Sequence, residues 1–314
     1  FSAAGVGMVL GLVQYKAGAG LLGRAGLLDE DTSSARFRRK NRNFYLIVAA
    51  AVLLMLVFGY LVNQGVFPLS MQQIAAGLGY GILILVLFYF IFLFVAGGHS
   101  PIEKKRLGVI FWLFILAAIF WSGFEQAGSS LNLFADQSTD RVIAGWEVPA
   151  SWLQSVNPIF IILLAPVFGW LWTWLAARNA NPSIPVKFAL GLLGLAAGFF
   201  VISWGAANAG PGNLASPAWL VVTYFLHTCG ELCLSPVGLS SITKLAPKGR
   251  VGQMMGIWFV GAALGNLFAG LLSGQLEELS SDALFGKVAL FIGAAGVIAL
   301  LASPFVRKLM GDVK

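Results

Sequence analysis

Charge is the scarcest property of this sequence: only 11% of its 314 residues are charged, whereas 58% are hydrophobic. Soluble domains average about 25% charged residues, so the composition excludes a soluble globular protein. The formal net charge of +7 suggests nucleic-acid binding at first sight. The basic residues, however, stand in short clusters between apolar runs, which is the pattern of membrane topology. We therefore expect a polytopic membrane protein without a nucleic-acid partner.

Cysteine and histidine are almost absent, with two residues of each. Cys229 and Cys233 lie four positions apart in one apolar run, too few for a disulfide framework and without the four-ligand pattern of a zinc site. His227 and Glu231 have the spacing of a metal-binding pair, but one pair without further ligands is a weak signal. We predict no metal, and we interpret both cysteines as packing residues.

Long apolar runs are abundant, and eight of them reach the roughly 20 residues that a helix needs to cross a bilayer. The chain opens at Phe1 inside a further apolar run, residues 1–15, without a basic leader; we interpret it as the end of a helix that began upstream. The eight predicted spans are 44–61, 74–95, 109–131, 152–176, 186–206, 218–239, 254–272 and 288–305.

The loops between these spans support the count. All Lys and Arg residues except Arg141 and Lys287 fall in alternate loops, on one side of the membrane. The opposite side carries most of the loop carboxylates. A wrong number of spans would scramble this alternation. Because cytoplasmic loops are rich in Lys and Arg, we expect a cytoplasmic C-terminus.

Two carboxylates lie inside the predicted spans, and the first is Glu125. An ionised carboxylate at the bilayer centre costs roughly 2.5–3.5 kcal/mol, so such a residue is a candidate functional site. At 100° per residue a continuous helix would place Glu125 in one stripe with aromatic, small and polar residues. The stripe contains Trp121, Glu125, Gly128, Ser129 and Asn132. It is typical of a helix that lines a wet cavity.

The second carboxylate is Glu231, which shares its predicted helix face with Tyr224, His227 and Ser235. One interpretation is a substrate or proton site on this face. The alternative is a protonated Glu231 that bonds to a neighbouring helix. No Lys or Arg lies deep in any span, so neither carboxylate has a basic partner here. Pro236 predicts a kink one turn later.

Three further residues are candidates for the wall of a cavity. The amide of Asn157 needs a partner in the membrane, either as part of a pocket or as a bridge between helices. Trp258 and Phe259 are either pocket aromatics or ordinary packing residues. Two GxxxG pairs predict close helix packing, namely Gly194 with Gly198 and Gly261 with Gly265.

Three motifs carry a family resemblance. They are FWSGFEQAGSSLNLFADQSTDR at 120–141, QSVNPIFI at 154–161 and GELCLSPVGLSSITKLAPKGRVGQMMGIWFVGAALGN at 230–266. In this order they resemble the proton-dependent oligopeptide transporter (POT) family of the major facilitator superfamily. The resemblance implies an all-α, polytopic transmembrane bundle that corresponds to the C-terminal half of the family. The N-terminal six-helix half, with its ExxERFxYY motif, is absent from this sequence.

The resemblance also implies a division of the chain into four parts. They are the end of helix 6 (1–15), a cytoplasmic linker (16–43), an extra transmembrane hairpin with a cytoplasmic loop (44–106) and the six-helix bundle of helices 7–12 (107–314).

The family's functional residues map onto this sequence by motif position. Glu231 resembles the glutamate that binds the α-amino group of the peptide, and Asn157 resembles an asparagine of the same pocket. Glu125 resembles a glutamate implicated in proton coupling and gating. The other pocket positions are Trp121, Trp258, Phe259 and Ser235, and the outer-gate positions are Asp136, Asp140 and Arg141.

The function implied by this resemblance is proton-coupled symport of di- and tripeptides by alternating access, without a cofactor other than the coupling protons. The expected partners are di- and tripeptides, protons, the lipid bilayer and the N-terminal half of the same transporter. The expected location is the bacterial inner membrane. Alternatives are a same-family transporter of nitrate or a drug-like molecule, or a membrane subunit that does not transport. We do not expect an enzyme, because no nucleophile with an oriented base is visible.

Overall fold

The computed structural model describes residues 2–23, 34–209, 213–273, 279–311 and 313. Contacts divide the chain into two units, Phe1–Leu69 and Ser70–Lys314. Several charged residues used in the loop argument, namely Arg24, Glu277, Glu278 and Lys314, lie outside the described residues.

The first unit contains α1 (Ser2–Ala17), the short 3-10 helix η1 (Ala19–Leu22) and α2 (Ala35–Asn63). The side chain of Ser34 caps α2 by accepting a hydrogen bond from the backbone N–H of Phe37 at 3.1 Å. The basic segment 36–42 therefore forms the first turns of a long helix. The described side chains of α2 are not buried within this unit, although the helix is strongly apolar. Such a helix requires lipid or protein around it.

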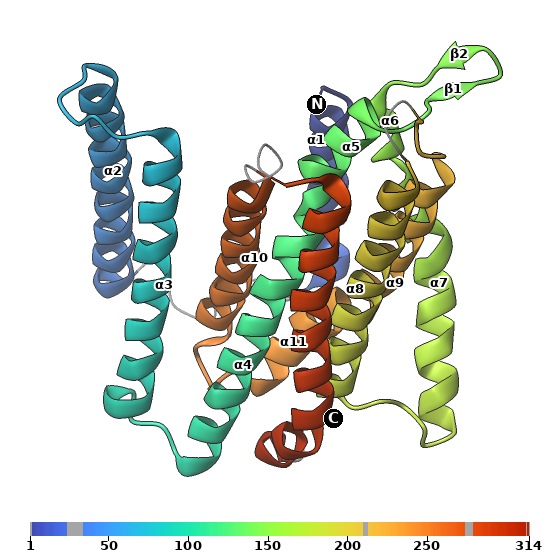
Figure 1. Ribbon diagram of the computed structural model, residues 1–314. Coiled ribbons are helices and arrows are strands. Elements are labelled where there is room, and N and C mark those ends of the chain that lie inside the picture. Colours follow the sequence, from blue (N-terminus) through green and yellow to red (C-terminus); the bar gives the residue numbers. More distant parts are fainter. Residues whose placement is uncertain (1, 24–33, 210–212, 274–278, 312, 314) are drawn as a thin grey trace. The chain divides into compact units, whose positions relative to one another are not determined.

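The second unit contains the remaining elements (Figure 1). They are α3 (Met71–Ala96), α4 (Pro101–Phe124), the 3-10 helix η2 (Glu125–Gly128), α5 (Ser130–Gln137), β1 (Val142–Ile143), β2 (Trp146–Glu147), α6 (Ala150–Leu153), α7 (Val156–Ala177), α8 (Ile184–Asn208), α9 (Ala218–Leu245), α10 (Val251–Ser273) and α11 (Ser281–Met310). Across both units, the described residues contain eight helical segments long and apolar enough to span a membrane, one for each predicted span. The predicted spans are thus confirmed, and the short hairpin of β1 and β2 is an addition.

The span that carries Glu125 is interrupted, which corrects the prediction of one continuous helical stripe. After α4 ends at Phe124, the chain tightens into η2, and Ser129 leaves helical geometry with φ −125° and ψ −98° before α5 begins. Glycine in this segment lowers its helix propensity. The side chain of Gln126 stabilises the break with hydrogen bonds described below. The stripe expected from Trp121 to Asn132 is therefore wrong beyond the start of η2.

The span that carries Asn157 is also divided. The short helix α6 ends at Leu153, and α7 begins at Val156. Pro158 occupies the third position of α7, where its missing N–H breaks no bond of the helix. Asn157 consequently lies in the first turn of α7.

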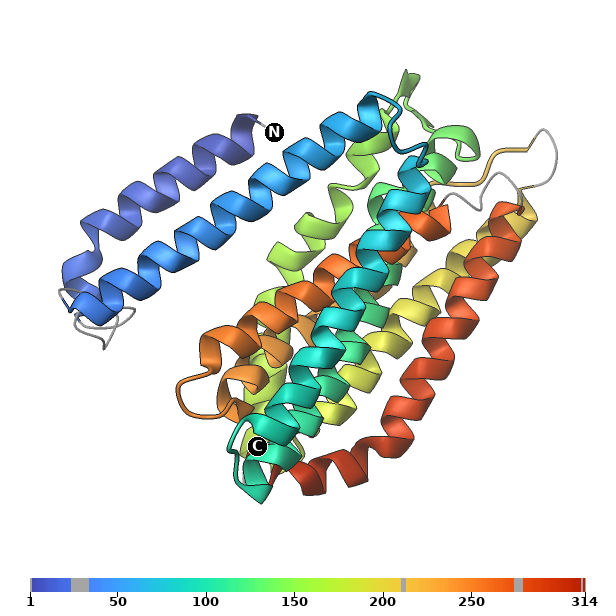
Figure 2. The same cartoon turned by 90° about the vertical axis from the view of Figure 1, so that its left-hand side faces the viewer.

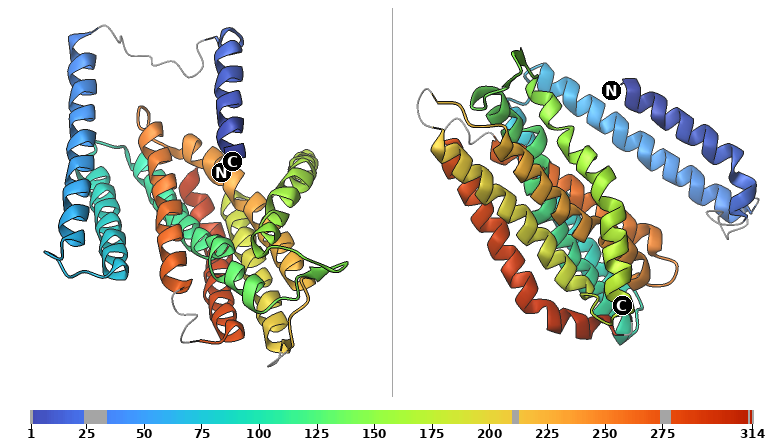
Figure 3. Two further views of the ribbon diagram at one scale, coloured as in Figure 1. Left: turned by 90° about the horizontal axis from the view of Figure 1, so that it is seen from above. Right: turned by 90° about the vertical axis from the view of Figure 1, so that its right-hand side faces the viewer.

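Helix α8 packs along both α9 and α11 (Figure 3), and α4 contributes further buried residues to the core of the second unit. Glycine allows the closest approach. A Cβ on Gly198 would lie 2.4 Å from Cδ2 of His227 on α9, and a Cβ on Gly265 would lie 2.4 Å from the Cβ of Trp121 on α4. Both predicted GxxxG pairs therefore lie at helix contacts, as small residues do in membrane bundles.

The second unit has two ends of different character (Figures 1 and 2). One end, which we call the hairpin end, bears β1 and β2, and its basic residues are Arg141 and Lys287. The other, which we call the basic end, bears the remaining Lys and Arg residues of this unit that the structure describes. These are Lys104, Lys105, Arg106, Arg178, Lys187, Lys244, Lys248, Arg250, Arg307 and Lys308. The alternation of charge read from the sequence is thus present in the folded bundle.

Candidate functional site

Glu125 lies where its helix breaks. It is the C-terminal cap of α4 and the first residue of η2, and its side chain is half-buried. The carboxylate interacts with the side chain of Asn266 on α10. The break sets Glu125 in a turn between two helices, so its position depends on how α4 and α5 are oriented.

Glu231 lies within α9, which continues for more than three turns beyond it. Its carboxylate interacts with the side chain of Asn157 on α7 and, through charge, with Glu125. One of its oxygens, Oε2, is buried and has no hydrogen-bond partner among the described residues. A buried carboxylate oxygen without a donor is costly, so this atom is available to a ligand.

The two glutamates and the two asparagines form one cluster, which we call the carboxylate centre: Glu125, Glu231, Asn157 and Asn266. The described part of the chain contributes no Lys or Arg to the interactions of either glutamate. Two carboxylates near each other repel when both are ionised, and Glu231 feels the charge of Glu125. A proton or an ammonium group between them would relieve that repulsion. The geometry therefore favours a cationic guest.

Asn157 is held by α9. Its Nδ2 donates to Oγ1 of Thr228 at 2.9 Å, and that hydroxyl donates to the carbonyl oxygen of Tyr224 at 2.7 Å. The two alternatives for Asn157 are thus compatible, because the same amide bridges two helices and faces Glu231. Thr228 was not among the sequence candidates, since a threonine in an apolar run gives no signal of its own.

Gln126 and Asn266 were also missed by the sequence analysis. Gln126 is almost fully buried, and its Nε2 donates to the carbonyl oxygens of Ser122 at 3.4 Å and Ala269 at 3.3 Å. Its Oε1 accepts from the hydroxyls of Ser129 and Ser130. Gln126 therefore ties the break to α10. The sequence offered one signal for Gln126, namely its position next to Glu125 in a polar stretch.

Four other residues near the break or on α9 carry polar atoms that are buried without a partner among the described residues. They are Trp121, through Nε1, Asn132, through Oδ1, His227, through Nε2, and Ser235, through Oγ. Trp121 packs edge-on against Phe124 with ring centroids 5.3 Å apart. Unsatisfied buried polar groups of this kind are rare in native proteins and mark places where water or a ligand binds.

The adjacent residues Trp258 and Phe259 differ sharply in solvent exposure. Trp258 is 3% exposed, and its ring lies against Gly238 of α9, where an added Cβ would be 2.2 Å away, and edge-on to Phe188 of α8. Phe259 is 61% exposed. The structure thus places Trp258 in the packed core and Phe259 on the surface of α10, and it does not bring either ring into the carboxylate centre.

The predicted outer-gate residues lie at the hairpin end. Arg141 forms ion pairs with Asp136 at 3.1 Å and with Glu147 at 2.9 Å, and it donates to the carbonyl oxygen of Val148 at 2.9 Å. Asp140 accepts a hydrogen bond from the backbone N–H of Val142 at 3.1 Å. Among the described residues, Arg141 is therefore paired within its own loop, and Glu147 is an additional partner that the sequence analysis did not name.

Comparison with known proteins identifies relatives over most of the chain. A model of the POT family matches residues 1–291. "Peptide transporter YePEPT" of Yersinia enterocolitica is 42% identical over 274 residues, which is 85% of this chain and 53% of that protein. "Dipeptide and tripeptide permease A" of Escherichia coli K12 is 29% identical over 283 residues, which is 86% of this chain and 54% of that protein.

The fold is shared with solved structures as well. The crystal structure of a peptide transporter POT in complex with sulfate matches with a TM-score of 0.81 and 34% identity, over 99% of this chain and 62% of that chain. The chain thus spans about half the length of the two curated relatives described above. The expected fold class, an all-helical membrane bundle of the major facilitator type, is confirmed. On the family match and the similarity of sequence and fold, the chain belongs to the POT family.

Proposed function

We propose that this chain is the C-terminal part of a proton-coupled symporter of di- and tripeptides, located in a bacterial inner membrane. The observation that carries the proposal is the carboxylate centre, in which Glu231 and Glu125 interact without a basic partner among the described residues. A peptide brings an α-ammonium group, which is the cation that such a centre accepts. The names of the relatives, peptide transporter and dipeptide and tripeptide permease, agree with this chemistry.

Within this proposal Glu231 binds the α-ammonium group, and Asn157 orients the carboxylate from the first turn of α7. Ser235 and Trp121 offer unsatisfied polar atoms to the rest of the ligand. Phe259 lies outside the carboxylate centre, and we assign its exposed ring to the part of the peptide pocket that the N-terminal half completes, whereas buried Trp258 packs α10 against α9. The carboxylate of the peptide needs a cation, which we assign to the N-terminal half that completes the transporter, because substrate sites of such transporters lie between the two repeats.

Glu125 is proposed as the coupling residue. Its position at a helix break allows its solvation to differ between the outward-open and inward-open states, and a group can couple proton binding to reorientation only if its environment differs between them. Asp136, Asp140 and Arg141 are proposed to form the outer gate at the hairpin end. The basic end is then cytoplasmic by the positive-inside rule, and so is the C-terminus.

The test is transport by the full-length protein reconstituted in liposomes. With an inward proton gradient, a dipeptide should accumulate above its external concentration, and a proton ionophore should abolish that accumulation. A dipeptide blocked at its amino group should accumulate far less. Uphill uptake that persists with the ionophore would refute proton coupling, and equal uptake of the blocked peptide would refute recognition of the amine.

The same liposomes separate the remaining alternatives. Nitrate and amine-free drug-like anions are offered in place of the peptide under the same gradient. Accumulation of nitrate with no uptake of peptide would assign a different substrate to this member of the family. No uptake of any substrate by folded, full-length protein would favour a subunit that does not transport.

A further inference from the structure

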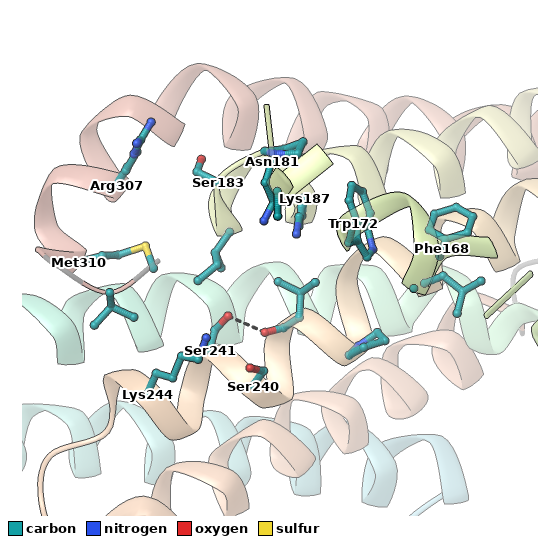
Figure 4. A pocket seen from close by; sticks show the side chains of 18 of the residues that line it. Phe168, Trp172, Asn181, Ser183, Lys187, Ser240, Ser241, Lys244, Arg307 and Met310 are labelled. Carbon is teal, nitrogen blue, oxygen red and sulfur yellow. Dashed lines mark hydrogen bonds between the residues drawn. The ribbon is translucent and has the colours of Figure 1, made fainter. Parts of the chain in front are cut away.

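A cavity of about 610 Å³ lies at the basic end of the second unit, between α7, α8, α9 and α11 (Figure 4). Its polar wall contains three basic residues from three helices: Lys187 of α8, Lys244 of α9 and Arg307 of α11. Its apolar wall includes Phe168 and Trp172 of α7. None of the residues proposed above for peptide binding or gating lines this cavity, so it is a separate feature of the bundle.

Lys187 is the unusual member of this group because it is only 7% exposed. Its Nζ lies 4.2 Å from the centre of the Trp172 ring. In the part of the chain that the structure describes, this ammonium group has no carboxylate and no hydrogen-bond acceptor, and Lys244 adds a repulsive charge. A cation over an indole ring offsets only part of the cost of burying a charge. Lys187 therefore lacks the anion that a buried ammonium group needs.

The backbone strengthens the positive character of the cavity. Ser183, the N-cap of α8, lines it together with Ile184, and the side chain of Ser183 makes no capping hydrogen bond. Pro185 has no N–H, so the first turn of α8 offers the N–H groups of Ile184 and Val186 to an anion, and the helix dipole favours negative charge there. Lys187 extends from the first turn of the same helix, so backbone and side chain offer positive charge to one space.

The depth of the cavity in the membrane follows from the aromatic residues of α7. Trp170 and Trp174 are exposed on this helix, and the guanidinium of Arg178 lies 3.9 Å from the centre of the Trp174 ring. Tryptophan beside arginine at the end of an apolar helix is typical of the membrane–water boundary. The basic wall of the cavity thus lies at the level of lipid headgroups, while its apolar wall extends toward the acyl chains.

We propose that this cavity binds a phosphate-bearing anion through Lys187, Lys244, Arg307 and the N-terminus of α8, and that the anion is the headgroup phosphate of an anionic phospholipid. Basic pockets between transmembrane helices on the cytoplasmic side bind such headgroups in other membrane proteins. Free phosphate shares the anionic chemistry but would leave the apolar wall formed by Phe168 and Trp172 uncovered. The proposal is independent of peptide transport.

The test is native mass spectrometry of the full-length transporter in detergent with either phosphatidylglycerol or phosphatidylcholine. The reference protein and all variants carry Asp312→Asn. Asp312 lies outside the described residues and is two positions from Met310, which lines the cavity. The substitution removes a carboxylate that could otherwise compete with the lipid for the basic residues. Lys187→Gln should reduce the phosphatidylglycerol adducts roughly fivefold, the effect of losing one basic contact to an anionic lipid. Lys187→Arg should retain them. Lys287→Gln, which removes an exposed lysine at the hairpin end, is the matched control and should also retain them.

Three comparisons decide the assignment. Equal adducts for Lys187→Gln and the control, or equal binding of phosphatidylcholine and phosphatidylglycerol, would overturn the proposal. Displacement of phosphatidylglycerol by inorganic phosphate at equal concentration would overturn the lipid as the occupant in favour of the free ion. If Lys187→Gln does not fold, Arg307→Gln replaces it, because Arg307 is exposed and its loss should still lower lipid binding severalfold.

Discussion

The two intramembrane glutamates occupy backbones of opposite kinds. Glu231 belongs to a helix that continues unbroken on both sides of it, and even Pro236 does not end α9. Glu125 terminates α4 and begins a 3-10 turn. A carboxylate on a continuous helix keeps its position when the helix moves as a rigid body. A carboxylate at a break changes its surroundings when the two segments reorient.

This difference suggests a division of labour within one electrostatic site. Glu231 has the fixed position that recognition of a ligand requires, and Asn157 and Thr228 hold the neighbouring helix against it. Glu125, to which we assign coupling, lies at the break between α4 and α5, and Gln126 bonds the turn to α10. Because the two carboxylates interact, a change in the protonation of one alters the protonation of the other. The following predictions test whether the two roles can be separated.

The largest effect is expected for Glu231→Gln in the full-length transporter. Loss of one partner from a buried charged hydrogen bond costs roughly 2–5 kcal/mol, so binding of peptides with a free amino group should weaken by about 100-fold. Analogues blocked at the amino group should change little. Isothermal titration with both ligand types measures the difference. The control is Asp282→Asn, which removes a carboxylate from the first turn of α11 at the hairpin end. Equal losses for both ligand types would remove the assigned role.

The rigidity of α9 is tested by Trp258→Ala. The ring fills the space against Gly238, and truncation of a buried tryptophan costs about 3–5 kcal/mol. The thermal midpoint of the purified transporter should therefore fall by several degrees, while the folded fraction keeps its preference for free amino groups. Phe259→Ala is the matched control, because its exposed ring should leave the midpoint unchanged and lower only peptide affinity. An unchanged midpoint with weaker binding in Trp258→Ala would show instead that this ring contacts the ligand.

Coupling is tested by Glu125→Gln. Exchange of peptide across a liposome at equal pH requires only that the loaded carrier reorient, whereas uphill accumulation requires that proton binding and reorientation be linked. We expect accumulation under a proton gradient to fall by about tenfold, within the usual range of coupling energies, with exchange nearly unchanged. A variant that still accumulates peptide at the wild-type level would exclude Glu125 as an essential coupling residue and shift that role to the N-terminal half.

The sequence predicted the spans well because run length and charge alternation are local properties. It did not predict the break at Glu125, since the contact that holds the break joins Gln126 to Ala269, more than 140 positions away. It also could not separate Trp258 from Phe259. Helix α10 is apolar over most of its surface, so the pattern does not show which of two adjacent rings faces the core. The two glutamates were evident because an intramembrane carboxylate is rare whatever its backbone does.

The smallest and most discriminating effect is expected for Asn157→Ala. Its amide makes a bond to Thr228 that packing alone would explain, and it also interacts with the Glu231 carboxylate, which implies a part in recognition. Loss of a hydrogen bond costs roughly 0.5–1.5 kcal/mol, so peptide affinity should fall about fivefold. Thr228→Val removes the same interhelical bond but leaves the amide beside Glu231, so it should lower the thermal midpoint with less effect on affinity. In the double variant the two stability losses should not add, because they remove one bond, while the affinity loss should match that of Asn157→Ala alone. If Thr228→Val weakened peptide binding as much as Asn157→Ala, the amide would act only by holding α7 against α9, and recognition would rest on Glu231 without its neighbour.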